Sequence, residues 1–392
     1  MSKTLTELAQ QLRETNKKVQ LIYAFNGTGK TRLSREFTQL IARQPLEDEG
    51  VVAEDAARHK ILYYNAYTED LFVWDNGAEP KLKIQPNTFT DWILNEQGQD
   101  QNIINYFQHF STGKLTPRFN PEYAIKNDND EEIRVKAFTE VTFSLQRGND
   151  EYSNNIKISK GEESHFIWSI FYTLLDLVIG IANVPEPSDR ESNQFDHLKY
   201  VYIDDPVSSL DENHLIELAV GLATLIKSSF YSTVSGEGIK FIISTHSAIF
   251  YNVLYNELGI KSGLILSQFD DGTYQLEEKK GDSNKSFSYH LHIKNNIKKA
   301  IEQRSVQRYH FALLRNLYEK TANFLGYEKW SDLLPGDKSA YAKRIMNFYP
   351  HNTLSNEEIA EPTEPEKEMV KYLLDNLNNY GYLTQKVKND AL

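Results

Sequence analysis

The sequence has no cysteine in its 392 residues, so disulfide bonds and zinc sites built on thiolates are excluded. This absence fits the reducing cytoplasm, where we expect the protein to be located. The first 18 residues form a polar helical pattern and lack the apolar centre of a secretory signal peptide. Internal repeats and long heptad runs are also missing, which argues against solenoid folds and long coiled coils.

Long hydrophobic runs are scarce, with an exception at residues 166–184. These 19 residues carry a single charge, Asp176, and are long enough to cross a membrane. The polar string SKGEES directly precedes them, and no cluster of Lys or Arg flanks them. Because the cores of large proteins contain helices that are apolar nearly all round, we expect a buried core helix and no membrane partner.

Positive charge is in deficit, since the net charge is −12 at pH 7. A protein this acidic is not expected to coat DNA non-specifically. The deficit is uneven, because residues 279–320 contain ten Lys or Arg and three acids. Charge alone leaves two interpretations of this basic segment open, a local site for a polyanion or a solvated helix face.

Short apolar runs of strand length occur at residues 19–23, 60–64, 200–203 and 240–244, and helical patterns separate them. Buried strands that alternate with helices are typical of an α/β sheet layered by helices. The chain is long enough for two or three domains, each with its own core. We therefore predict an α/β domain at the N-terminal end.

The pattern changes after residue 268, where a hairpin is followed by helical segments near 286–325, 339–348 and 367–378. A linker rich in Pro and Glu precedes the last of these segments. We therefore predict a domain boundary near residue 268, with the α/β domain over 1–268 and a mainly α-helical domain over 269–392.

Residues 24–31 (AFNGTGKT) follow the first apolar run and form a P-loop for nucleotide phosphates. Small residues let successive backbone N–H groups point at the same oxygens, a lysine reaches the β and γ phosphates, and a hydroxyl holds Mg²⁺. The loop departs from the usual pattern at Ala24, because glycine there gives easy access to positive φ. The predicted nucleotide-binding residues are Asn26, Gly27, Thr28, Gly29, Lys30 and Thr31.

Two later motifs complete a nucleotide site within one chain. The string KYVYIDDP ends in Asp204, which we expect to hold Mg²⁺ with Thr31, and Asp205, which we expect to orient or deprotonate the attacking water. ABC-type ATPases usually have glutamate at the second position, so the shorter aspartate predicts slow hydrolysis or a sensor role. The string FIISTHS contains His246, which we expect to contact the γ-phosphate.

Two further motifs indicate a second copy of the chain. ISKGEE resembles the ABC signature, with Ser159 and Gly161 at its informative positions, although Ser-x-Gly-Glu is also an ordinary helix N-cap. SSLD, which ends in Asp211, matches the loop that couples two nucleotide sites. Each site of this class takes a signature from another subunit, so we expect a nucleotide-bound head-to-tail homodimer. The 126 residues between Thr31 and Ile158 leave no room for long coiled-coil arms.

A further metal contact is expected from an amide side chain outside these motifs. Gln85 in KIQPN and Asn65 in YYNAYTEDLF are both candidates. The sequence does not choose between them.

The C-terminal part contains FALLRNLYEKTANF at residues 311–324, in which Arg315 and Glu319 lie four residues apart on one helix face. Taken alone, this is an ordinary surface ion pair worth roughly a few tenths of a kcal/mol. The surrounding strings change this interpretation. VQLIYAFNGTGKTRLSREF, GNDEYSNNIKISKGEESHFIWSIFYTLLD, YVYIDDPVSSLDENHLIELA, GDSNKSFSYHLH and RNLYEKTANFLGY resemble the bacterial anticodon nucleases of the PrrC family.

This resemblance implies an ABC-type P-loop ATPase domain that controls a C-terminal RNase domain of the helical HEPN type. It implies a metal-independent endoribonuclease that cuts tRNA-Lys in the anticodon loop 5′ to the wobble base, leaving 2′,3′-cyclic phosphate and 5′-OH ends. The implied catalytic residues are Arg315, Glu319 and His351, and the choice of general base between Glu319 and His351 stays open. The residues implied in substrate recognition are Asp282, Ser283, Asn284 and Lys285, with Asp282 the leading candidate.

The resemblance also implies ligands and partners. GTP hydrolysis and dTTP binding are implied, although residues 24–31 do not distinguish guanine from adenine, so GTP and ATP both stay open. The implied role is defence against phage, in which a type I restriction-modification complex inhibits the enzyme and a phage-derived activator releases it. Two alternatives are a DNA-repair ATPase of the RecF or Rad50 kind, which the acidic charge and missing arms disfavour, and the same nuclease acting on another RNA.

Overall fold

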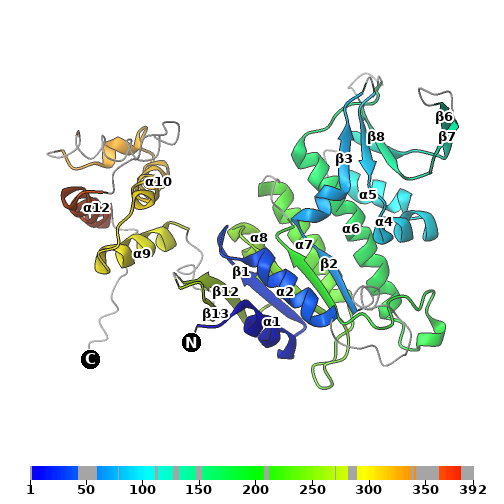
Figure 1. Ribbon diagram of the computed structural model, residues 1–392, viewed down its shortest axis with the longest axis horizontal. Helices are drawn as coiled ribbons and strands as arrows, with labels where there is room; N and C mark the ends of the chain where they lie inside the picture. The colour runs from blue at the N-terminus through cyan, green and yellow to red at the C-terminus, as the bar shows by residue number, and fades with distance from the viewer. Residues whose placement is uncertain are drawn as a thin grey trace. The chain divides into compact units, whose positions relative to one another are not determined.

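The chain folds into two compact units, Met1–Gly281 and Asp282–Leu392, in a computed structural model (Figure 1). The structure describes residues 2–42, 60–77, 79–110, 114–126, 132–146, 152–206, 212–269, 271–280, 289–336, 340 and 362–380. Asp211, the recognition residues 282–285 and His351 lie outside these ranges, as does nearly all of the helix expected at 339–348.

A six-stranded sheet organises the first unit, in the order β13–β12–β1–β11–β10–β2. Five of these strands are parallel, and β13 is antiparallel at one edge. The four apolar runs expected to be strands are all in this sheet. The strands are β1 Val19–Tyr23, β2 Ile61–Tyr64, β10 Tyr200–Asp204, β11 Lys240–Thr245, β12 Ser262–Gln268 and β13 Tyr274–Lys280.

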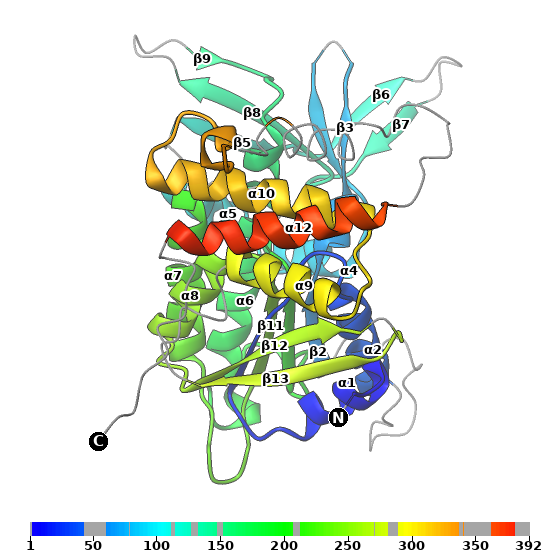
Figure 2. The same ribbon diagram turned by 90° about the vertical axis from the view of Figure 1, so that its left-hand side faces the viewer.

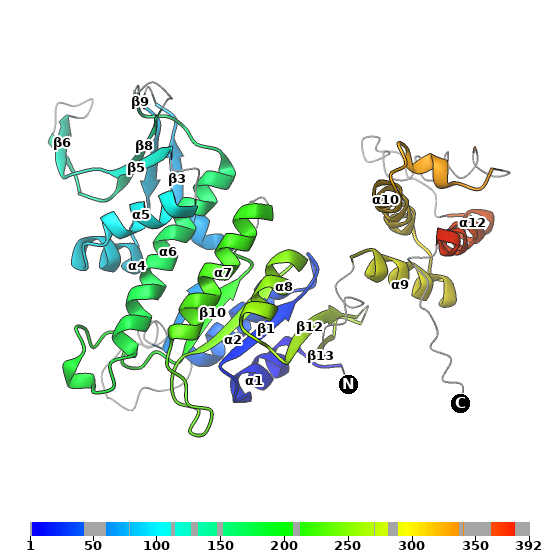
Figure 3. The same cartoon turned by 180° about the vertical axis from the view of Figure 1, so that it is seen from behind.

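Helices cover both faces of this sheet (Figures 1 and 3). On one face lie α1 (Leu5–Glu14) and α2 (Lys30–Ala42), whose buried Leu12, Leu33 and Phe37 pack with Tyr202 and Ile242 of the strands. The other face carries α6 (Lys160–Ala182), α7 (Glu212–Ser228) and α8 (Ala248–Glu257). This is the layered α/β arrangement predicted from the sequence.

Residues 166–182 of the apolar segment lie within α6, which is long and apolar enough to cross a membrane by length and composition. Of its most apolar 18 residues, 78% are buried in the fold. Its Trp168 and Phe171 contact Tyr64 of β2. The helix is therefore packed as a core helix, as expected.

A smaller antiparallel sheet, in the order β3–β4–β8–β5 with β9 paired to β8, lies between β2 and β10 in the chain. Phe107 and Phe143 from this part pack against Phe166 of α6, which joins the small sheet to the core. Its strands are β3 Phe72–Asp75, β4 Lys81–Ile84, β5 Leu115–Phe119, β8 Glu140–Gln146 and β9 Tyr152–Ser153, with a separate hairpin β6 Tyr123–Lys126 and β7 Glu132–Val135. The accompanying helical segments are η1 Ala66–Leu71, α4 Thr88–Asp91, the π-helix η2 Trp92–Glu96 and α5 Asp100–Phe110, and η3 Pro187–Asp189 follows α6.

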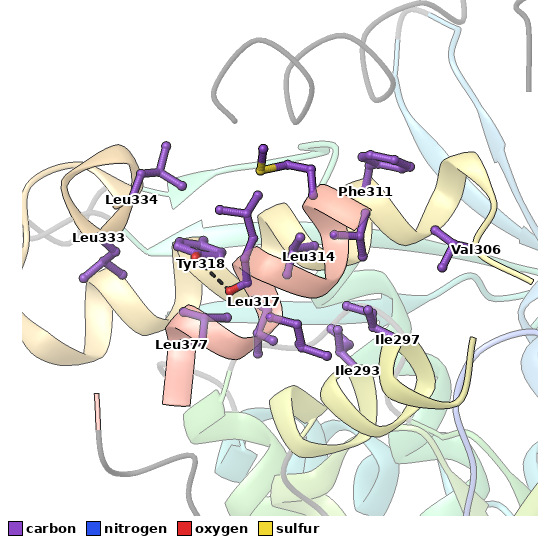
Figure 4. Close-up of a cluster of buried hydrophobic side chains, with 14 of the residues drawn as sticks. Ile293, Ile297, Val306, Phe311, Leu314, Leu317, Tyr318, Leu333, Leu334 and Leu377 are labelled. Carbon is purple, nitrogen blue, oxygen red and sulfur yellow. Dashed lines mark hydrogen bonds between the residues drawn. The ribbon is translucent and has the colours of Figure 1, made fainter. Parts of the chain in front are cut away.

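The described part of the second unit is helical (Figure 2). Its core surrounds Tyr318, whose hydroxyl donates to the Leu373 carbonyl at 2.9 Å (Figure 4). The same hydroxyl accepts from Asn376 at 3.2 Å. The elements are α9 Tyr289–Glu302, α10 Arg308–Leu325, η5 Trp330–Leu333, α12 Glu364–Asn376 and η7 Leu377–Tyr380.

The division between the units falls after Gly281, whereas the sequence placed it near residue 268. The physical reason is the pairing of β12 with β13, which extends in register from Ser262–Lys280 to Gln268–Tyr274. A boundary at 268 would separate two hydrogen-bonded strands. The hairpin itself was expected, but its membership of the central sheet was not.

Candidate active sites

The P-loop connects the carboxyl end of β1 to the start of α2. Gly27 and Gly29 have φ values of 83° and 92°, a region that glycine reaches without steric cost. A Cβ added to Gly29 would lie 3.1 Å from Tyr274 Cε1, so the side of the loop next to β13 is tightly packed. The hydroxyl of Thr28 donates to the Phe25 carbonyl, which closes the turn.

Ala24 does not need the conformational freedom of glycine. Its φ is not positive, its N–H donates to the Thr245 carbonyl at 3.0 Å, and its side chain is fully buried. The residue therefore continues the pairing of β1 with β11 before the loop turns. The departure from the usual P-loop pattern has no backbone cost here.

Lys30 is buried, and its ammonium group lies inside the loop. It donates to the carbonyls of Ala24 and Phe25 and to Asn26 Oδ1 at 3.2–3.3 Å. It also lies 3.5 Å from Asp205 Oδ2. Asn26 thus orients the lysine that the motif assigns to the phosphates.

Asp204 ends β10 and is 1% exposed. One carboxylate oxygen accepts from the Ser244 hydroxyl at 2.6 Å, and the other accepts from Ser34 at 3.4 Å. Burial raises the pKa of Asp204, and hydrogen bonds from Ser244 and Thr31 oppose the shift. A buried carboxylate with so little solvation can bind a cation, because the positive charge stabilises the ionised carboxylate in place of water.

Asp205 has φ of 53°, and its carboxylate lies against His246. The His246 Nδ1–H donates to the two oxygens at 2.6 and 2.7 Å, and the His246 backbone N–H donates at 3.2 Å. Burial alone would raise the pKa of Asp205, but the His246 hydrogen bond and the Lys30 charge outweigh it and hold the pKa below its usual value. The structure therefore brings Lys30, Asp205 and His246 together.

The structure adds residues around Asp204 that the sequence analysis missed. The Tyr63 hydroxyl lies 2.7 Å from the Ser34 hydroxyl, which in turn reaches Asp204. Tyr63 belongs to β2, Ser34 to α2 and Ser244 to β11. Ser244 lies two residues before His246 in FIISTHS, but no sequence signal linked Tyr63 to the site.

Asn65 and Gln85 were both candidates for an additional metal contact. Asn65 directly follows β2, which pairs in parallel with β10, so it lies at the same sheet edge as Asp204. Its Oδ1 accepts from the Thr68 N–H at 3.1 Å. Gln85 follows β4 in the small sheet, and its N–H donates to the Leu71 carbonyl. Position favours Asn65, and a metal contact by either residue stays a prediction.

The residues at this sheet edge fit a magnesium nucleotide. Gly27 and Gly29 hold backbone conformations typical of a phosphate cradle, and Thr31 and Asp204 supply the hard oxygen donors that Mg²⁺ prefers. Each Asp204 oxygen has two lone pairs and uses only part of this capacity on the serines.

Ser159 caps α6, as the ordinary interpretation of Ser-x-Gly-Glu expects. Its side chain accepts from the Glu162 N–H at 3.3 Å, and the Glu162 carboxylate accepts from the Ser159 N–H at 2.7 Å. Gly161 lies in the first turn of α6. Glu163, also in the first turn, accepts from the Trp74 ring N–H of β3 at 2.8 Å, so the start of α6 is attached to the small sheet. Among the described residues, no hydrogen bond joins Ser159 to the P-loop.

In the second unit, Arg315 and Glu319 form the pair expected on α10. Arg315 Nε donates to Glu319 Oε1 at 2.9 Å, and the Arg315 side chain is 22% exposed. The guanidinium carbon lies 5.6 Å from the centre of the Trp330 ring. The pair is therefore partly buried and held by an aromatic ring, unlike an isolated surface ion pair.

Comparisons with known proteins bear on these two sites. No family profile matches the chain. A curated anticodon nuclease from Escherichia coli is 58% identical over an alignment 416 positions long, which covers 99% of this chain and all of that protein.

Solved structures with some similarity are heads of Smc proteins. The Smc head domain from Pyrococcus furiosus is 13% identical and covers 55% of this chain and 40% of its own, with a TM-score of 0.28. The SMC head domain from Thermotoga maritima is 11% identical and covers 68% and 92%, with a TM-score of 0.30. Scores this low do not define the fold, which follows from the strand order and the P-loop described above.

The relative from Escherichia coli matches both units of this chain, the P-loop unit and the helical unit with its Arg–Glu pair, from end to end. Identity of 58% over nearly the full length of both proteins is far above the level at which families share one fold. The chain therefore belongs to the PrrC family of bacterial anticodon nucleases.

Proposed function

We propose that the protein is a tRNA anticodon endoribonuclease whose activity a bound nucleotide controls. The observation that carries this proposal is the Arg315–Glu319 pair on α10, held against Trp330, in a chain of the anticodon nuclease family. An arginine and a carboxylate side by side can bind a phosphate and move a proton, and these are two requirements of RNA cleavage.

In the proposed reaction, the ribose 2′-oxygen loses its proton to a general base and attacks the adjacent phosphorus. The P–O5′ bond breaks, and the 5′-oxygen takes a proton from a general acid, so the products are a 2′,3′-cyclic phosphate and a 5′-OH. Arg315 stabilises the charge on the phosphate oxygens through its planar guanidinium. One of Glu319 and His351 takes the proton from the 2′-OH, and the other gives a proton to the 5′-oxygen. Either assignment of the two residues balances the reaction. No metal is needed for this step.

The proposed substrate is tRNA-Lys, cut 5′ to the wobble base. An unpaired anticodon loop suits this chemistry because its bases can leave the stack and be contacted by protein. Asp282, Ser283, Asn284 and Lys285 are the proposed recognition residues, within the basic segment 279–320. Cleavage of a different RNA is the alternative outcome of the test below.

The test is cleavage of total tRNA by the purified protein in chelator, with the cut ends mapped. The wild type is expected to give one main cut in tRNA-Lys with a cyclic phosphate end. Arg315→Ala, Glu319→Ala and His351→Ala are each expected to lower cleavage by roughly 10²-fold or more, since each removes a transition-state interaction. Nucleotide hydrolysis in the three variants is the control and is expected to stay near the wild-type rate. Retained cleavage in all three variants would show that Arg315, Glu319 and His351 are not the catalytic residues.

We also propose that the first unit acts as an ABC-type ATPase in the regulation of the nuclease. Thr31 and Asp204 would hold Mg²⁺, which neutralises charge on the nucleotide phosphates when it is bound. Lys30 would contact the phosphates, Asp205 would orient or deprotonate the attacking water, and His246 would contact the γ-phosphate. GTP or ATP is the proposed hydrolysed nucleotide, and dTTP a regulatory ligand.

The proposed active form of the ATPase is a head-to-tail homodimer in which Ser159 and Gly161 meet the nucleotide of the second copy. At the N-terminal end of α6, Ser159 is exposed and Gly161 is half-buried, which supports this proposal. A slowly hydrolysed nucleotide analogue is expected to double the mass measured by light scattering. Lys30→Met, which removes the phosphate contact, is the matched control and is expected to stay monomeric. A monomeric wild type with bound analogue would contradict the proposal.

In the cell, we propose a cytoplasmic enzyme that acts in defence against phage. A type I restriction-modification complex is the proposed inhibitor, and a phage-derived activator would release the enzyme from it. Co-purification of the protein with such a complex, and its loss on addition of the activator, is the expected result.

A further inference from the structure

A hollow of about 410 Å³ lies directly beside Glu319 in the second unit. It is lined by Glu319, Asn323, Glu328, Lys329, Trp330 and Ser331. Two elements form it: the last turns of α10, and the segment after α10 that leads into η5. A hollow of this size falls within the range of roughly 300–1,000 Å³ typical of small-molecule sites.

Trp330 forms one wall of this hollow, and its contacts with neighbouring side chains hold its ring in place. One contact of its ring is the Arg315 guanidinium, 5.6 Å from the ring centre. Another is the ring of Tyr318, with centroids 6.5 Å apart and an interplanar angle of 76°. Tyr318 is fully buried, so Trp330 is anchored to the core of the unit and not merely placed on its surface. An aromatic ring held in this way is a platform on which a planar group can stack.

The charges of the lining favour a base over a phosphate group. Glu319 and Glu328 are acids, and Lys329 is the single cation among the lining residues. Two carboxylates repel a phosphate, but they accept hydrogen bonds from the N–H groups of a nucleobase. Among the residues that the structure describes, the side chains of Asn323 and Ser331 form no hydrogen bond with the protein, so both can pair with a base edge.

The position of the hollow relative to Arg315 and Glu319 indicates which nucleotide of the strand could place its base there. Glu319 is at once a lining residue and the partner of Arg315. A phosphate held by Arg315 would therefore have the neighbouring nucleotide within reach of the hollow. Bases of an unpaired loop are free to turn out of the strand and stack on an aromatic ring.

We infer that this hollow is a subsite for an unstacked nucleobase next to the scissile phosphate, with Trp330 as its stacking wall and Asn323 as a hydrogen-bonding group. The inference rests on the proposed cleavage at Arg315 and Glu319. In this arrangement Trp330 has two roles, because it also holds Arg315 in position. The base entering the hollow fixes the register of the strand, and the bond beside it is the bond that is cut.

The test uses the full-length protein and a synthetic anticodon stem-loop RNA. Two further RNAs carry an abasic site at the nucleotide before or after the cleaved bond. On the intact RNA, Trp330→Ala is expected to lower kcat/KM by roughly 10–100-fold, the range of base–aromatic stacking. One of the two abasic RNAs is expected to lower wild-type kcat/KM by a similar factor. On that abasic RNA, Trp330→Ala is expected to cost at most a few-fold further, because the stacking partner is already absent.

Two further variants make the result specific to the base. Trp330→Phe keeps an aromatic wall and is expected to restore most of the activity lost in Trp330→Ala. Asn323→Ala is at an exposed position, so it does not endanger folding, and it is expected to lower activity on the intact RNA and not on the sensitive abasic RNA. Tyr309→Ala is the matched control, since Tyr309 is a half-exposed aromatic on the same helix, about 15 Å from Glu319 along the axis. Its activity is expected to be unchanged.

A direct measurement follows binding without cleavage. A 2′-deoxy nucleotide before the cut removes the attacking hydroxyl, and 2-aminopurine at the sensitive position reports stacking by loss of fluorescence. Quenching by the wild type and Trp330→Phe, but not by Trp330→Ala, is the expected result.

Three outcomes would overturn the inference. Equal losses for Trp330→Ala on intact and abasic RNA would show that Trp330 only positions Arg315. Wild-type activity that is insensitive to both abasic sites, or fluorescence quenching that persists in Trp330→Ala, would show that no base is held at this wall. Failure of the wild type to cut the intact RNA would instead refute the proposed nuclease function itself.

Discussion

Asp205 receives the Nδ1–H of His246 at 2.6 and 2.7 Å while its own backbone has φ of 53°. Asp205 follows the last residue of β10, and its N–H donates to the Ser244 carbonyl at 2.8 Å. The left-handed residue ends the strand and brings the carboxylate toward the end of the neighbouring strand β11, where His246 begins the next loop. Such a conformation costs energy in any residue with a Cβ, and the contacts of the carboxylate with His246 and Lys30 compensate for it.

The backbone strain at Asp205 can be measured separately from the lost charge. Asp205→Gly and Asp205→Ala remove the same carboxylate, but only alanine retains a Cβ in the left-handed region. We expect Asp205→Ala to unfold in urea with a free energy about 1 kcal/mol below that of Asp205→Gly, measured without nucleotide. Equal unfolding free energies would indicate that φ at this position relaxes when the carboxylate is removed.

Asp204 and Asp205 are expected to affect stability with opposite signs. Burial raises the pKa of Asp204, so its charged form is disfavoured in the folded protein. Asp204→Asn is therefore expected to raise the melting temperature of the nucleotide-free protein while it weakens binding of the magnesium nucleotide. One neighbouring serine hydroxyl can accept from the new amide N–H, and the other can still donate to the amide oxygen.

Asp205→Asn is the matched control at the adjacent position. The pKa of Asp205 is lowered, because the His246 hydrogen bond and the Lys30 charge outweigh burial. Its stabilisation is present above the unfolded pKa of about 3.9 and is lost as the pH falls through the folded value. Asp205→Asn is expected to lower the melting temperature at pH 7. A lower melting temperature for both Asp204→Asn and Asp205→Asn would contradict the prediction that the two carboxylates affect stability in opposite directions.

His310 gives the second unit a dependence on pH. The residue is 2% exposed, and its Nδ1 accepts from the Gln307 N–H at 2.9 Å at the start of α10. Burial lowers the pKa of His310, and the contact of its ring with the Gln307 carbonyl at 3.3 Å opposes the shift only in part.

Because the folded pKa is lowered, the unfolded chain takes up the proton first as the pH falls below about 6.5, and stability is lost. The expected slope is at most about 1.4 kcal/mol per pH unit, measured by chemical unfolding between pH 7.5 and 5. Glutamine in the same position can accept the Gln307 N–H without titrating. His310→Gln is therefore expected to reduce the slope, and an unchanged slope would assign it to other groups.

The buried hydroxyl of Tyr318 joins α10 to α12. It donates to the Leu373 carbonyl and accepts from Asn376. Tyr318→Phe leaves both partners without this contact, so we expect a loss of about 1–2 kcal/mol in the unfolding free energy of the second unit. Tyr309→Phe, at a half-exposed residue of the same helix, is the control and is expected to change stability by less than about 0.5 kcal/mol.

Much of the fold could be predicted because its signals are local. Each apolar run of the central sheet is a short, continuous string, and the order P-loop, acidic pair and histidine is written along the chain. Residues 26–31 and the pair at 204 and 205 lie at the ends of predicted strands, and parallel strands bring such ends to one edge. The boundary near 268 failed because strand pairing, which joins β13 to β12, is not a local property.

The sequence by itself determined the P-loop, the strands that support the nucleotide site, the buried nature of α6 and the helix face shared by Arg315 and Glu319. These features depend on residues within a few positions of one another, so periodicity and motif spacing suffice to identify them. Only the tertiary structure decided that Tyr63 and Ser34 reach Asp204, that Asp205 turns toward His246, and that Trp330 lies against Arg315. Those contacts join different elements, and they depend on the strand order and on the packing of side chains, which no short stretch of sequence encodes.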